Sequence, residues 1–325
     1  MFIMKNKTKG EKDISISIVN YNSTNYLIDC IKSIRKYSER LDIEILITDN
    51  ASLDFKPSAI HEIFPDATIS CNNKNKGFAY AHNQNFRLSN GKIFFILNPD
   101  TLLTDGCLRS LLGVFNKYPD AGIVTPTLLF GNNKANTTYK ELPSIKSALF
   151  ELLYINNLIN ALINKYPVYV LDNDKNIIDI PCISGAAFMV RRDVYTKLNG
   201  LDEYFFLYFE ETDFCKRVND LLGMKIYLIK DIFVKHLYGK SSINTDFRQT
   251  IYYESYYKYF KKHFSPFKAG IIRLLIFLGG IFRFLGLNIK YFPLTKGWRV
   301  YSNKIYTSLR LIFWALGISS LSEKN

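Results

Sequence analysis

Four short clusters of polar residues carry side chains that could hold a charged ligand. They are residues 20–23, 49–52, 72–77 and 98–100, and each follows an apolar run rich in β-branched side chains. Asn, Asp, Ser and Gly also build ordinary turns, so a single cluster has two interpretations. If the four runs are strands of one parallel sheet, the clusters lie together at the edge where such sheets bind ligands.

Acidic residues and a histidine form a second set of candidates. Glu210, Glu211 and Asp213 begin a predicted helix, and His236 follows the last predicted strand. A carboxylate can act as a general base toward a hydroxyl group. The alternatives are structural, because acids in a first helical turn stabilise the helix by about 0.3–1 kcal/mol. Asp213 is also spaced to pair with Arg217 one turn later.

The elements that must position these side chains alternate along the chain. Strands are predicted at residues 14–20, 44–49, 67–71, 92–98 and 122–126, and helices at 25–38, 58–64, 78–88 and 105–117. This alternation is typical of an α/β protein with a parallel sheet covered on both faces. A helix is predicted near residues 144–165, followed by a strand at 187–190, helices at 191–198 and 210–222, and a strand at 225–229.

The composition is that of a folded protein. The chain has 325 residues, of which 48% are hydrophobic and 22% charged, and this length suggests about two domains. Its five cysteines are widely spaced and include no CxxC pair, which indicates reduced thiols and no zinc cluster. We predict a flexible N-terminus without a secretory signal at residues 1–13, an α/β domain at 14–245 and a helical segment at 246–325.

The net charge of +13 is concentrated at the C-terminal end. Residues 235–325 contain 15 Lys and Arg against 3 Asp and Glu, whereas the rest of the chain is almost neutral. The same segment is rich in Tyr, Phe, Ile and Leu. A basic and apolar segment indicates an anionic membrane surface as the partner, whereas nucleic acid would favour exposed polar helices.

One part of this segment predicts a helix in the membrane interface. Residues 269–289 are strongly apolar, but Arg273 and Arg283 limit the longest uncharged run to residues 274–282. A spanning helix needs about 20 apolar residues, and a central arginine costs roughly 2.5–3.5 kcal/mol. On a helical projection both arginines share an arc with three glycines. The opposite arc is apolar and contains Leu274, Phe277, Leu278, Ile281, Phe282 and Leu285.

A second helix of this kind is predicted at residues 298–316. The alternative is a helical pair that packs on the α/β domain or on a second subunit, which makes a homodimer a further candidate assembly. In that case as well, Arg273 and Arg283 are expected to face solvent.

The ordered set of motifs resembles glycosyltransferase family 2, in particular its bacterial rhamnosyltransferase-like branch. The motifs are Ile18-Val19-Asn20-Tyr21-Asn22, Thr48-Asp49-Asn50-Ala51-Ser52, Asn75-Lys76-Gly77-Phe78-Ala79, Asn98-Pro99-Asp100, Ser184-Gly185-Ala186 and the acidic helix at 210–217. The similarity covers about residues 14–260. It implies a GT-A fold, with a Rossmann-like mixed sheet flanked by helices, and inverting transfer from a nucleotide-diphosphate sugar.

The resemblance implies a donor site at the first four clusters. Asp49 matches the carboxylate that accepts from N3–H of a uracil or thymine ring, while Asn20, Asn22 and Asn50 stand beside the base and ribose. Gly77 allows a tight turn before a helix whose N-terminus favours negative charge. Asn98-Pro99-Asp100 stands at the family's metal site, where Asn98 replaces the usual first aspartate. Asp100 and His236 are then the ligands of Mn²⁺ or Mg²⁺, and an imidazole ligand suits Mn²⁺ better.

The resemblance also implies an acceptor side. Ser184, Gly185 and Ala186 match the small residues that let a sugar ring approach, and Glu210 stands next to them in the pattern. Glu211 aligns with the catalytic base and is one methylene longer than the usual aspartate. Asp213 is the second candidate for that role.

The donor expected from the resemblance is dTDP-L-rhamnose, with a UDP-sugar such as a galactofuranose donor as the close alternative. The acceptor is a glycan or a polyprenyl-diphosphate-linked sugar in cell-surface polysaccharide synthesis such as that of O-antigen. A nucleotidyltransferase would favour a Gly-rich basic loop after the first strand, which residues 20–23 lack. A membrane-docked adaptor with a decayed site is the non-enzymatic alternative. The expected location is cytoplasmic, peripheral at the inner face of the bacterial plasma membrane.

Overall fold

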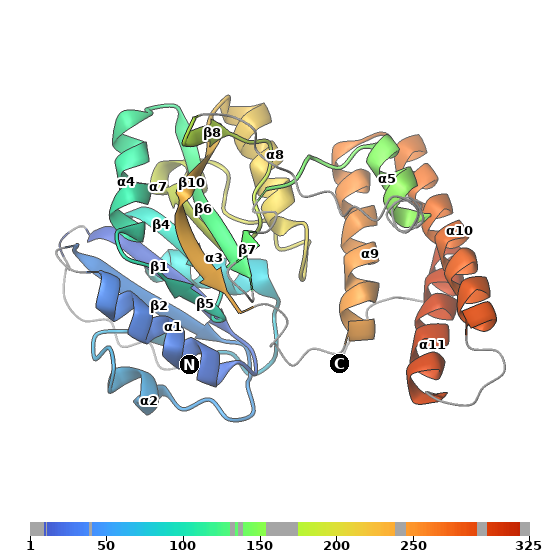
Figure 1. The fold of residues 1–325 in the computed structure, drawn as a ribbon, viewed down its shortest axis with the longest axis horizontal. Coiled ribbons are helices and arrows are strands. Elements are labelled where there is room, and N and C mark those ends of the chain that lie inside the picture. The colour runs from blue at the N-terminus through green and yellow to red at the C-terminus, as the bar shows by residue number, and fades with distance from the viewer. Residues whose placement is uncertain are drawn as a thin grey trace. The chain divides into compact units, whose positions relative to one another are not determined.

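The computed structural model describes residues 10, 12–38, 41–130, 134–135, 139–153, 175–237, 245–290 and 298–318 (Figure 1). The chain divides into two compact units. The sheet unit comprises Met1–Glu141, Tyr169–Glu203 and Glu210–Ser242, and the helical unit comprises Leu142–Val168, Tyr204–Phe209 and Ile243–Asn325. The chain thus enters the helical unit twice before its C-terminal part, whereas the sequence analysis assigned residues 14–245 to a single domain.

One ten-stranded mixed sheet organises the sheet unit, in the order β3-β2-β1-β4-β9-β6-β10-β5, with β7 beside β6 and β8 beside β10. The strands are β1 (Lys12–Asn20), β2 (Ile43–Asp49), β3 (Thr68–Cys71), β4 (Gly91–Leu97), β5 (Thr101–Leu103), β6 (Ala121–Phe130), β7 (Lys134–Ala135), β8 (Ile177–Asp179), β9 (Ala187–Arg191) and β10 (Lys225–His236). The four strands β3, β2, β1 and β4 are parallel. Strand β9 runs antiparallel to both β4 and β6, so the mixed α/β sheet is confirmed.

The helices of the sheet unit follow the predicted alternation. They are α1 (Thr24–Tyr37), α2 (Pro57–His61), α3 (Phe78–Leu88), α4 (Cys107–Lys117), α7 (Arg192–Lys197) and α8 (Glu210–Leu222). Helix α1 buries Leu27, Ile31 and Ile34 on one face, which is the three-to-four-residue spacing of an amphipathic helix. The helix predicted near residues 144–165 is α5 (Ile145–Leu152), and residues 154–165 lie outside the described part.

Strand β6 is longer than the sequence indicated. The predicted strand ends at Pro126, yet β6 continues to Phe130, although proline cannot donate a ladder hydrogen bond. Its neighbour β10 accommodates the proline with a bulge. Ile229 pairs with Pro126 and Phe233 pairs with Thr127. Residues 230–232 of β10 therefore form a bulge in the register with β6.

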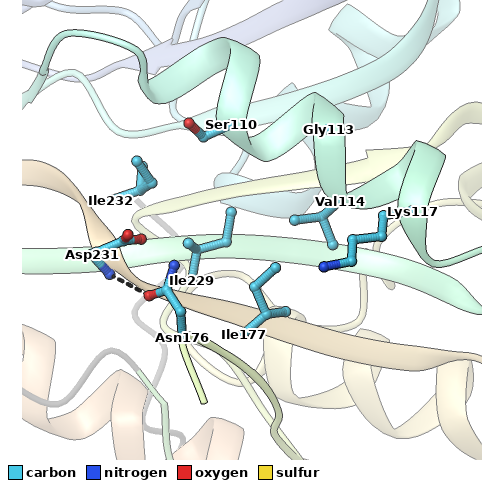
Figure 2. A pocket seen from close by; sticks show the side chains of 9 residues that line it. All are labelled: Ser110, Gly113, Val114, Lys117, Asn176, Ile177, Ile229, Asp231 and Ile232. Carbon is cyan, nitrogen blue, oxygen red and sulfur yellow. Dashed lines mark hydrogen bonds between the residues drawn. The ribbon is translucent and has the colours of Figure 1, made fainter. Parts of the chain in front are cut away.

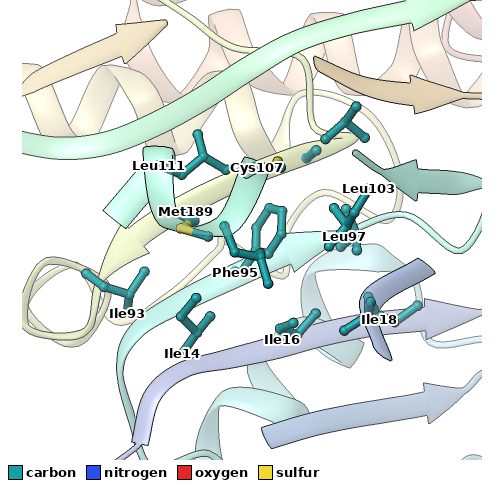
Figure 3. Packing of buried hydrophobic residues seen from close by; sticks show 14 of the residues in the cluster. Ile14, Ile16, Ile18, Ile93, Phe95, Leu97, Leu103, Cys107, Leu111 and Met189 are labelled. Carbon is teal, nitrogen blue, oxygen red and sulfur yellow. The ribbon is translucent and has the colours of Figure 1, made fainter. Parts of the chain in front are cut away.

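Apolar side chains from β1, β4, β9 and α4 form the main core on one face of the sheet (Figure 3). Ile14, Ile16 and Ile18 alternate along β1, as the period of a strand requires, and Phe95 and Met189 pack beside them. All five are fully buried. This packing holds the central strands together, so that the carboxyl ends of β1, β2 and β4 lie at the same edge of the sheet.

The opposite face of β1 and β2 carries a buried polar layer against α3. Asn85 donates to Ser17 Oγ (2.9 Å) and to the carbonyl of Ile18 (3.2 Å), and it accepts from Thr48 Oγ1 (2.7 Å). The ring of His82 bonds Ser17 Oγ through Nδ1 (2.7 Å). Asn85, where the family often has glycine, is therefore a satisfied buried amide, and His82 is a packing residue inside the fold.

Four helices form the described part of the helical unit: α5, α9 (Thr245–His263), α10 (Pro266–Lys290) and α11 (Trp298–Ala315). Their core is aromatic and includes Tyr256, Tyr259 and Phe260 of α9. Phe205 and Phe209, from the six-residue segment Tyr204–Phe209, belong to the same cluster. Ser255 Oγ of α9 also donates to the carbonyl of Leu207 (2.8 Å).

The inner face of α10 differs from the predicted one. Arg273 donates through Nε to the carbonyl of Ala315 (2.9 Å) and through a second nitrogen to that of Trp314 (3.2 Å), so it caps the C-terminal end of α11. A Cβ on Gly280 would lie 3.0 Å from Ile312 of α11, which makes glycine the residue that fits this approach. The expectation that Arg273 faces solvent is wrong, because Arg273 and Gly280 pack on α11. Of the predicted apolar arc, Leu274, Phe282 and Leu285 are exposed and the other three side chains are partly buried.

The buried imidazole of His82 generates a prediction about stability. Burial lowers the pKa of His82 to about 3, whereas an unfolded chain has a histidine pKa near 6.5. The unfolded state therefore binds a proton that the folded state refuses, and the free energy of unfolding falls as pH drops below about 6.5, by up to ~1.4 kcal/mol per unit. Urea unfolding of wild type and His82→Gln at pH 7.5 and 5 should show a smaller pH dependence in the variant. Equal dependence in both proteins would contradict the assignment.

Candidate active site

The carboxyl ends of β1 and β2 hold a preformed polar cluster. Asn20 and Asp49 are paired in the strand register. Asp49 Oδ1 accepts from Asn20 Nδ2 (2.8 Å) and Ser52 Oγ (2.6 Å), and Oδ2 accepts from the Ser52 amide (2.9 Å). The turn interpretation of Asp49 is thus realised, yet a carboxylate oxygen has two acceptor sites and Oδ2 uses one of them here. The cluster combines a fixed loop with remaining capacity for a ligand.

The adjoining loop backbones are held in unusual conformations. The backbone φ angles of Asn22 and Ala51 are 49° and 66°. Residues other than glycine and asparagine rarely adopt this left-handed region. Ser52 Oγ accepts from the Asn22 amide (2.8 Å), and Asn22 Oδ1 accepts from the Leu53 amide (3.1 Å). The two loops therefore brace each other, which is a form of strain that often marks binding sites.

Asn50 and Gly77 connect this cluster to the start of α3. Asn50 Nδ2 donates to the Gly77 carbonyl (3.2 Å), and Asn50 Oδ1 accepts from Asn72 (2.9 Å). Gly77 has a φ of 89° and directly precedes α3. A side chain would be strained in this conformation, so glycine is the residue that lets the loop turn into the helix.

Asp100 and His236 lie together although 136 residues separate them. Asp100 precedes β5, His236 ends β10, and these strands pair antiparallel. His236 Nε2 lies 3.1 Å from Asp100 Oδ1, and the Leu237 amide donates to the Asp100 carbonyl (2.8 Å). Two adjacent ligands of an octahedral ion at about 2.1 Å are about 3.0 Å apart, so the pair fits one edge of a divalent-metal site. Among the described residues no group of three His, Cys, Asp or Glu side chains is placed to hold a metal ion.

The small residues 184–186 lie between this site and the acidic helix. The Asn98 amide donates to the Ala186 carbonyl (2.8 Å). On the other side, a Cβ on Gly185 would lie 3.4 Å from Cγ of Glu211. The segment therefore joins the predicted donor side at Asn98 to the predicted acceptor side at Glu211.

Glu210 and Glu211 are neighbours with different environments. Glu211 Oε1 accepts from Lys140 Nζ (2.7 Å), while its Oε2 accepts no hydrogen bond from the described residues. Glu210 is buried, and its Oε2 has no partner among them. Burial first, and then the charge of Glu211, raise the pKa of Glu210 well above its ordinary value. Lys140 thus places a cation beside Glu211, whereas burial disfavours the charged form of Glu210.

Asp213 has a structural environment. It is fully buried, and its Oδ2 accepts from Arg217 Nε (2.7 Å). Arg217 also donates to the carbonyls of Leu198 (2.7 Å) and Gly200 (2.9 Å). This network ties α8 to the end of α7 and favours the structural interpretation of Asp213 over that of a base.

Two residues of the site escaped the sequence analysis. Ser52 stands in a motif that was recognised, but its bonds to Asn20 and Asp49 depend on the loop conformation. Lys140 lies in an irregular stretch without a motif. Its amide donates to the Cys182 carbonyl (3.0 Å), and this pairing, which sequence spacing does not reveal, brings it to Glu211.

A shallow pocket of about 190 Å³ lies elsewhere in the sheet unit (Figure 2). Residues of α4, β8 and the bulge of β10 line it: Ser110, Gly113, Val114, Lys117, Asn176, Ile177, Ile229, Asp231 and Ile232. Asn176 Oδ1 accepts from the Asp231 amide (3.1 Å). None of the candidate residues lines this pocket, so we do not assign it to the active site.

The geometry agrees with the family to which the chain belongs. Residues 15–198, more than half of the chain, match the glycosyl transferase family 2 model. This chain is therefore a member of glycosyltransferase family 2, and it is a glycosyltransferase.

Two curated relatives of the chain are also glycosyltransferases. An "N-acetylglucosaminyl-diphospho-decaprenol L-rhamnosyltransferase" of Mycobacterium tuberculosis is 22% identical over 227 residues, which cover 66% of this chain and 73% of the relative. A "Low-salt glycan biosynthesis hexosyltransferase" of Haloferax volcanii is 24% identical over 209 residues, which cover 63% of this chain and 61% of the relative. The resemblance to the rhamnosyltransferase-like branch is confirmed.

Solved structures confirm the GT-A fold. A mannosyltransferase from Pyrobaculum calidifontis, in complex with GDP-Man and Mn²⁺, matches with a TM-score of 0.53 and 14% identity, covering 95% of this chain and 87% of that one. GalNAc-T7 with UDP, GalNAc and Mn²⁺ matches with a TM-score of 0.58 and 13% identity, covering 95% and 56%. At these identities the likeness concerns the fold alone.

The environment of Asp213 predicts a large effect on stability. Asp213→Ala leaves the partly buried Arg217 without its carboxylate, so the free energy of unfolding should fall by about 3–5 kcal/mol. Asp220→Ala is the matched control, because Lys216 and Asp220 form an exposed pair of the same spacing on the same helix and such pairs contribute about 0–1 kcal/mol. Urea unfolding measures both variants, and equal losses would overturn the structural role of Asp213.

Proposed function

We propose that this glycosyltransferase moves a sugar from a nucleotide-diphosphate donor to a lipid-linked acceptor with inversion at the transferred carbon. The observation that carries the proposal is the link from Asn98 through the segment 184–186 to Glu211. This link joins a site suited to a nucleotide diphosphate to the carboxylate of Glu211, whose Oε2 accepts no hydrogen bond from the described residues. The mycobacterial relative, whose name contains both a diphospho-decaprenol acceptor and L-rhamnose, supports the choice of substrates.

On this proposal Glu211 acts as the general base. Its Oε2 takes the proton of the acceptor hydroxyl as the new bond to the sugar carbon forms and the bond from that carbon to the diphosphate oxygen breaks. Burial raises the pKa of Glu210, which favours its protonated form and makes it the weaker candidate for the base. Asp49, with Asn20, Asn22 and Asn50, holds the base and ribose, and Gly77 lets the start of α3 approach the donor.

Asp100 and His236 would hold Mn²⁺ or Mg²⁺, which offsets the charge of the leaving nucleoside diphosphate when bound. Their separation of 3.1 Å supports this assignment, as do the Mn²⁺ ions of the two structural neighbours. The backbone N–H of Asn98 donates to the Ala186 carbonyl. The Asn98 side chain stands in place of a carboxylate, so donor oxygens would supply further ligands to the ion.

The proposed donor is dTDP-L-rhamnose. A carboxylate at Asp49 accepts from the N3–H that thymine and uracil share, so a UDP-sugar, including a galactofuranose donor, is the second candidate. The membership of the rhamnosyltransferase-like branch favours rhamnose. We propose that the enzyme acts in cell-surface polysaccharide synthesis at the cytoplasmic face of the bacterial plasma membrane.

A nucleotide-release assay tests the base and the donor together. Purified protein is given dTDP-rhamnose or UDP-sugars with a polyprenyl-linked acceptor extract and Mn²⁺ or Mg²⁺. Release should require the metal, and Glu211→Gln should lower kcat by about 10²–10⁴-fold. Glu210→Gln is the matched variant, and we expect a far smaller loss because burial favours the protonated form of that carboxyl.

The outcomes separate the alternatives. Equal losses in both glutamine variants would contradict the assignment of Glu211. Turnover of a UDP-sugar alone would replace rhamnose as the donor, and absence of nucleotide binding in wild type would favour the decayed adaptor.

We also propose that the helical unit docks on an anionic membrane. Leu274, Phe282 and Leu285 of α10 are more than half exposed, and Phe267 is 77% exposed. Among the described helices α10 is long and apolar enough to cross a membrane, over Pro266–Leu287. Because Arg273 is used inside the unit, the outward face is apolar while the segment is strongly basic, which suits an interface helix.

Charged substitutions on this face test the docking. The double variant Phe282→Asp/Leu285→Asp should reduce sedimentation with phosphatidylglycerol–phosphatidylcholine vesicles by about tenfold or more, since it removes apolar contact and adds negative charge. Leu221→Asp is the control, because Leu221 is an equally exposed apolar residue on α8. Unchanged vesicle binding by the double variant would contradict the docking. A homodimer in solution that the double variant dissociates would assign the face to a second subunit.

A further inference from the structure

We infer that Lys140 is a positioning residue for the catalytic base, and that it fixes the Glu211 carboxylate so that one oxygen faces the acceptor. This inference rests on the proposed function, since it gives a role to a residue next to the proposed base. Lys140 belongs to none of the motifs that identify the family, and its segment has no sequence pattern that predicts a place in the site.

The backbone holds Lys140 beside the acceptor-side segment. Tyr139 forms an antiparallel bridge with Ile183, and the Lys140 amide donates to the Cys182 carbonyl (3.0 Å). The same strand of chain continues directly into Ser184, Gly185 and Ala186. Lys140 and the proposed acceptor side are thus parts of one local structure, and any shift of one moves the other.

The side chain of Lys140 occupies one oxygen of Glu211. Nζ lies 2.7 Å from Oε1, within a charge-assisted hydrogen bond. The Glu211 side chain is 9% exposed and that of Lys140 is 44% exposed, so the pair lies where solvent meets the fold. Oε2 accepts nothing from the described residues, which leaves it as the oxygen that can take a proton.

Gly185 leaves space for a methyl group next to the same side chain. An added Cβ would lie 3.4 Å from Cγ and 3.6 Å from Cδ of Glu211. Glutamate has one more rotatable bond than the aspartate usual at this place in the family, and each free bond spreads the carboxylate over more positions. The hydrogen bond from Lys140 restricts that freedom, and this restriction explains how the longer side chain can serve as a base.

Charge supports the same arrangement. Partial burial lowers the pKa of Lys140, but the Glu211 carboxylate and its hydrogen bond outweigh burial and leave that pKa raised. Lys140 therefore remains a cation. During transfer the acceptor proton moves to Oε2 of Glu211, and Lys140 keeps all of its own protons throughout.

The test compares Lys140→Met with Lys140→Arg under saturating donor and acceptor. Lys140→Met should lower kcat by about tenfold or more and leave the KM for the nucleotide sugar within about threefold. The acidic limb of its pH–rate profile should move upward by about one pH unit or more, because no cation then favours the carboxylate. Lys140→Arg should restore most of kcat and return the acidic limb. Lys146→Met, at an exposed lysine of α5, is the control.

A double-mutant cycle separates positioning from a general loss of structure. In the Glu211→Gln background, Lys140→Met should cause no further loss of kcat, because the carboxylate that it positions is gone. A further tenfold loss there, or an unmoved pH profile in Lys140→Met, would overturn the inference. A higher KM for the acceptor with an unmoved profile would overturn it too, in favour of acceptor binding. If wild type turns over no donor, the proposed function fails, whatever Lys140 does.

Discussion

The antiparallel ladder between β4 and β9 is the contact on which the arrangement of the site depends. In the sheet order β9 stands between β4, which ends the parallel donor half, and β6. The ladder pairs Leu97 with Ala187, and one further bond from Asn98 to Ala186 continues it into the site. Because these partners are about 90 residues apart in the chain, the fold must close a long loop before the two halves of the site meet. As a result, the groups proposed for donor and acceptor binding are held in place by a strand pairing in the packed core.

The sequence predicted the parallel half of the fold well, because alternating apolar runs and turn residues are local signals. It also predicted that Asn20, Asp49 and Asp100 would lie at strand ends. It could not predict that Pro126 lies inside a strand, since the bulge of β10 that accommodates it comes 100 residues later. Nor could it place Arg273, because a helical projection shows which residues share a face and says nothing about which face meets a neighbour.

Three acidic residues within four positions show how environment divides one chemistry into three roles. Glu210 is buried and its pKa is raised, Glu211 accepts a hydrogen bond from Lys140, and Asp213 is paired with Arg217. All three sit in the first turn of α8, where the helix dipole favours negative charge equally. What distinguishes them is the direction in which each side chain leaves the helix. The role of an acidic residue here follows from its neighbours in space and not from its position in the motif.

The segment Tyr204–Phe209 belongs to the helical unit, although the residues before and after it in the chain belong to the sheet unit. Phe205 and Phe209 complete the aromatic cluster of α9, yet they are encoded between parts of the sheet unit. Loss of the C-terminal helices by a single truncation would leave these two rings, and the backbone of Tyr208 and Phe209 with its positive φ angles, without the structure that supports them. Residues of the two units therefore alternate along the chain. A substitution in Tyr204–Phe209 acts on the folding of the helical unit, although the residues on either side of this segment belong to the sheet unit.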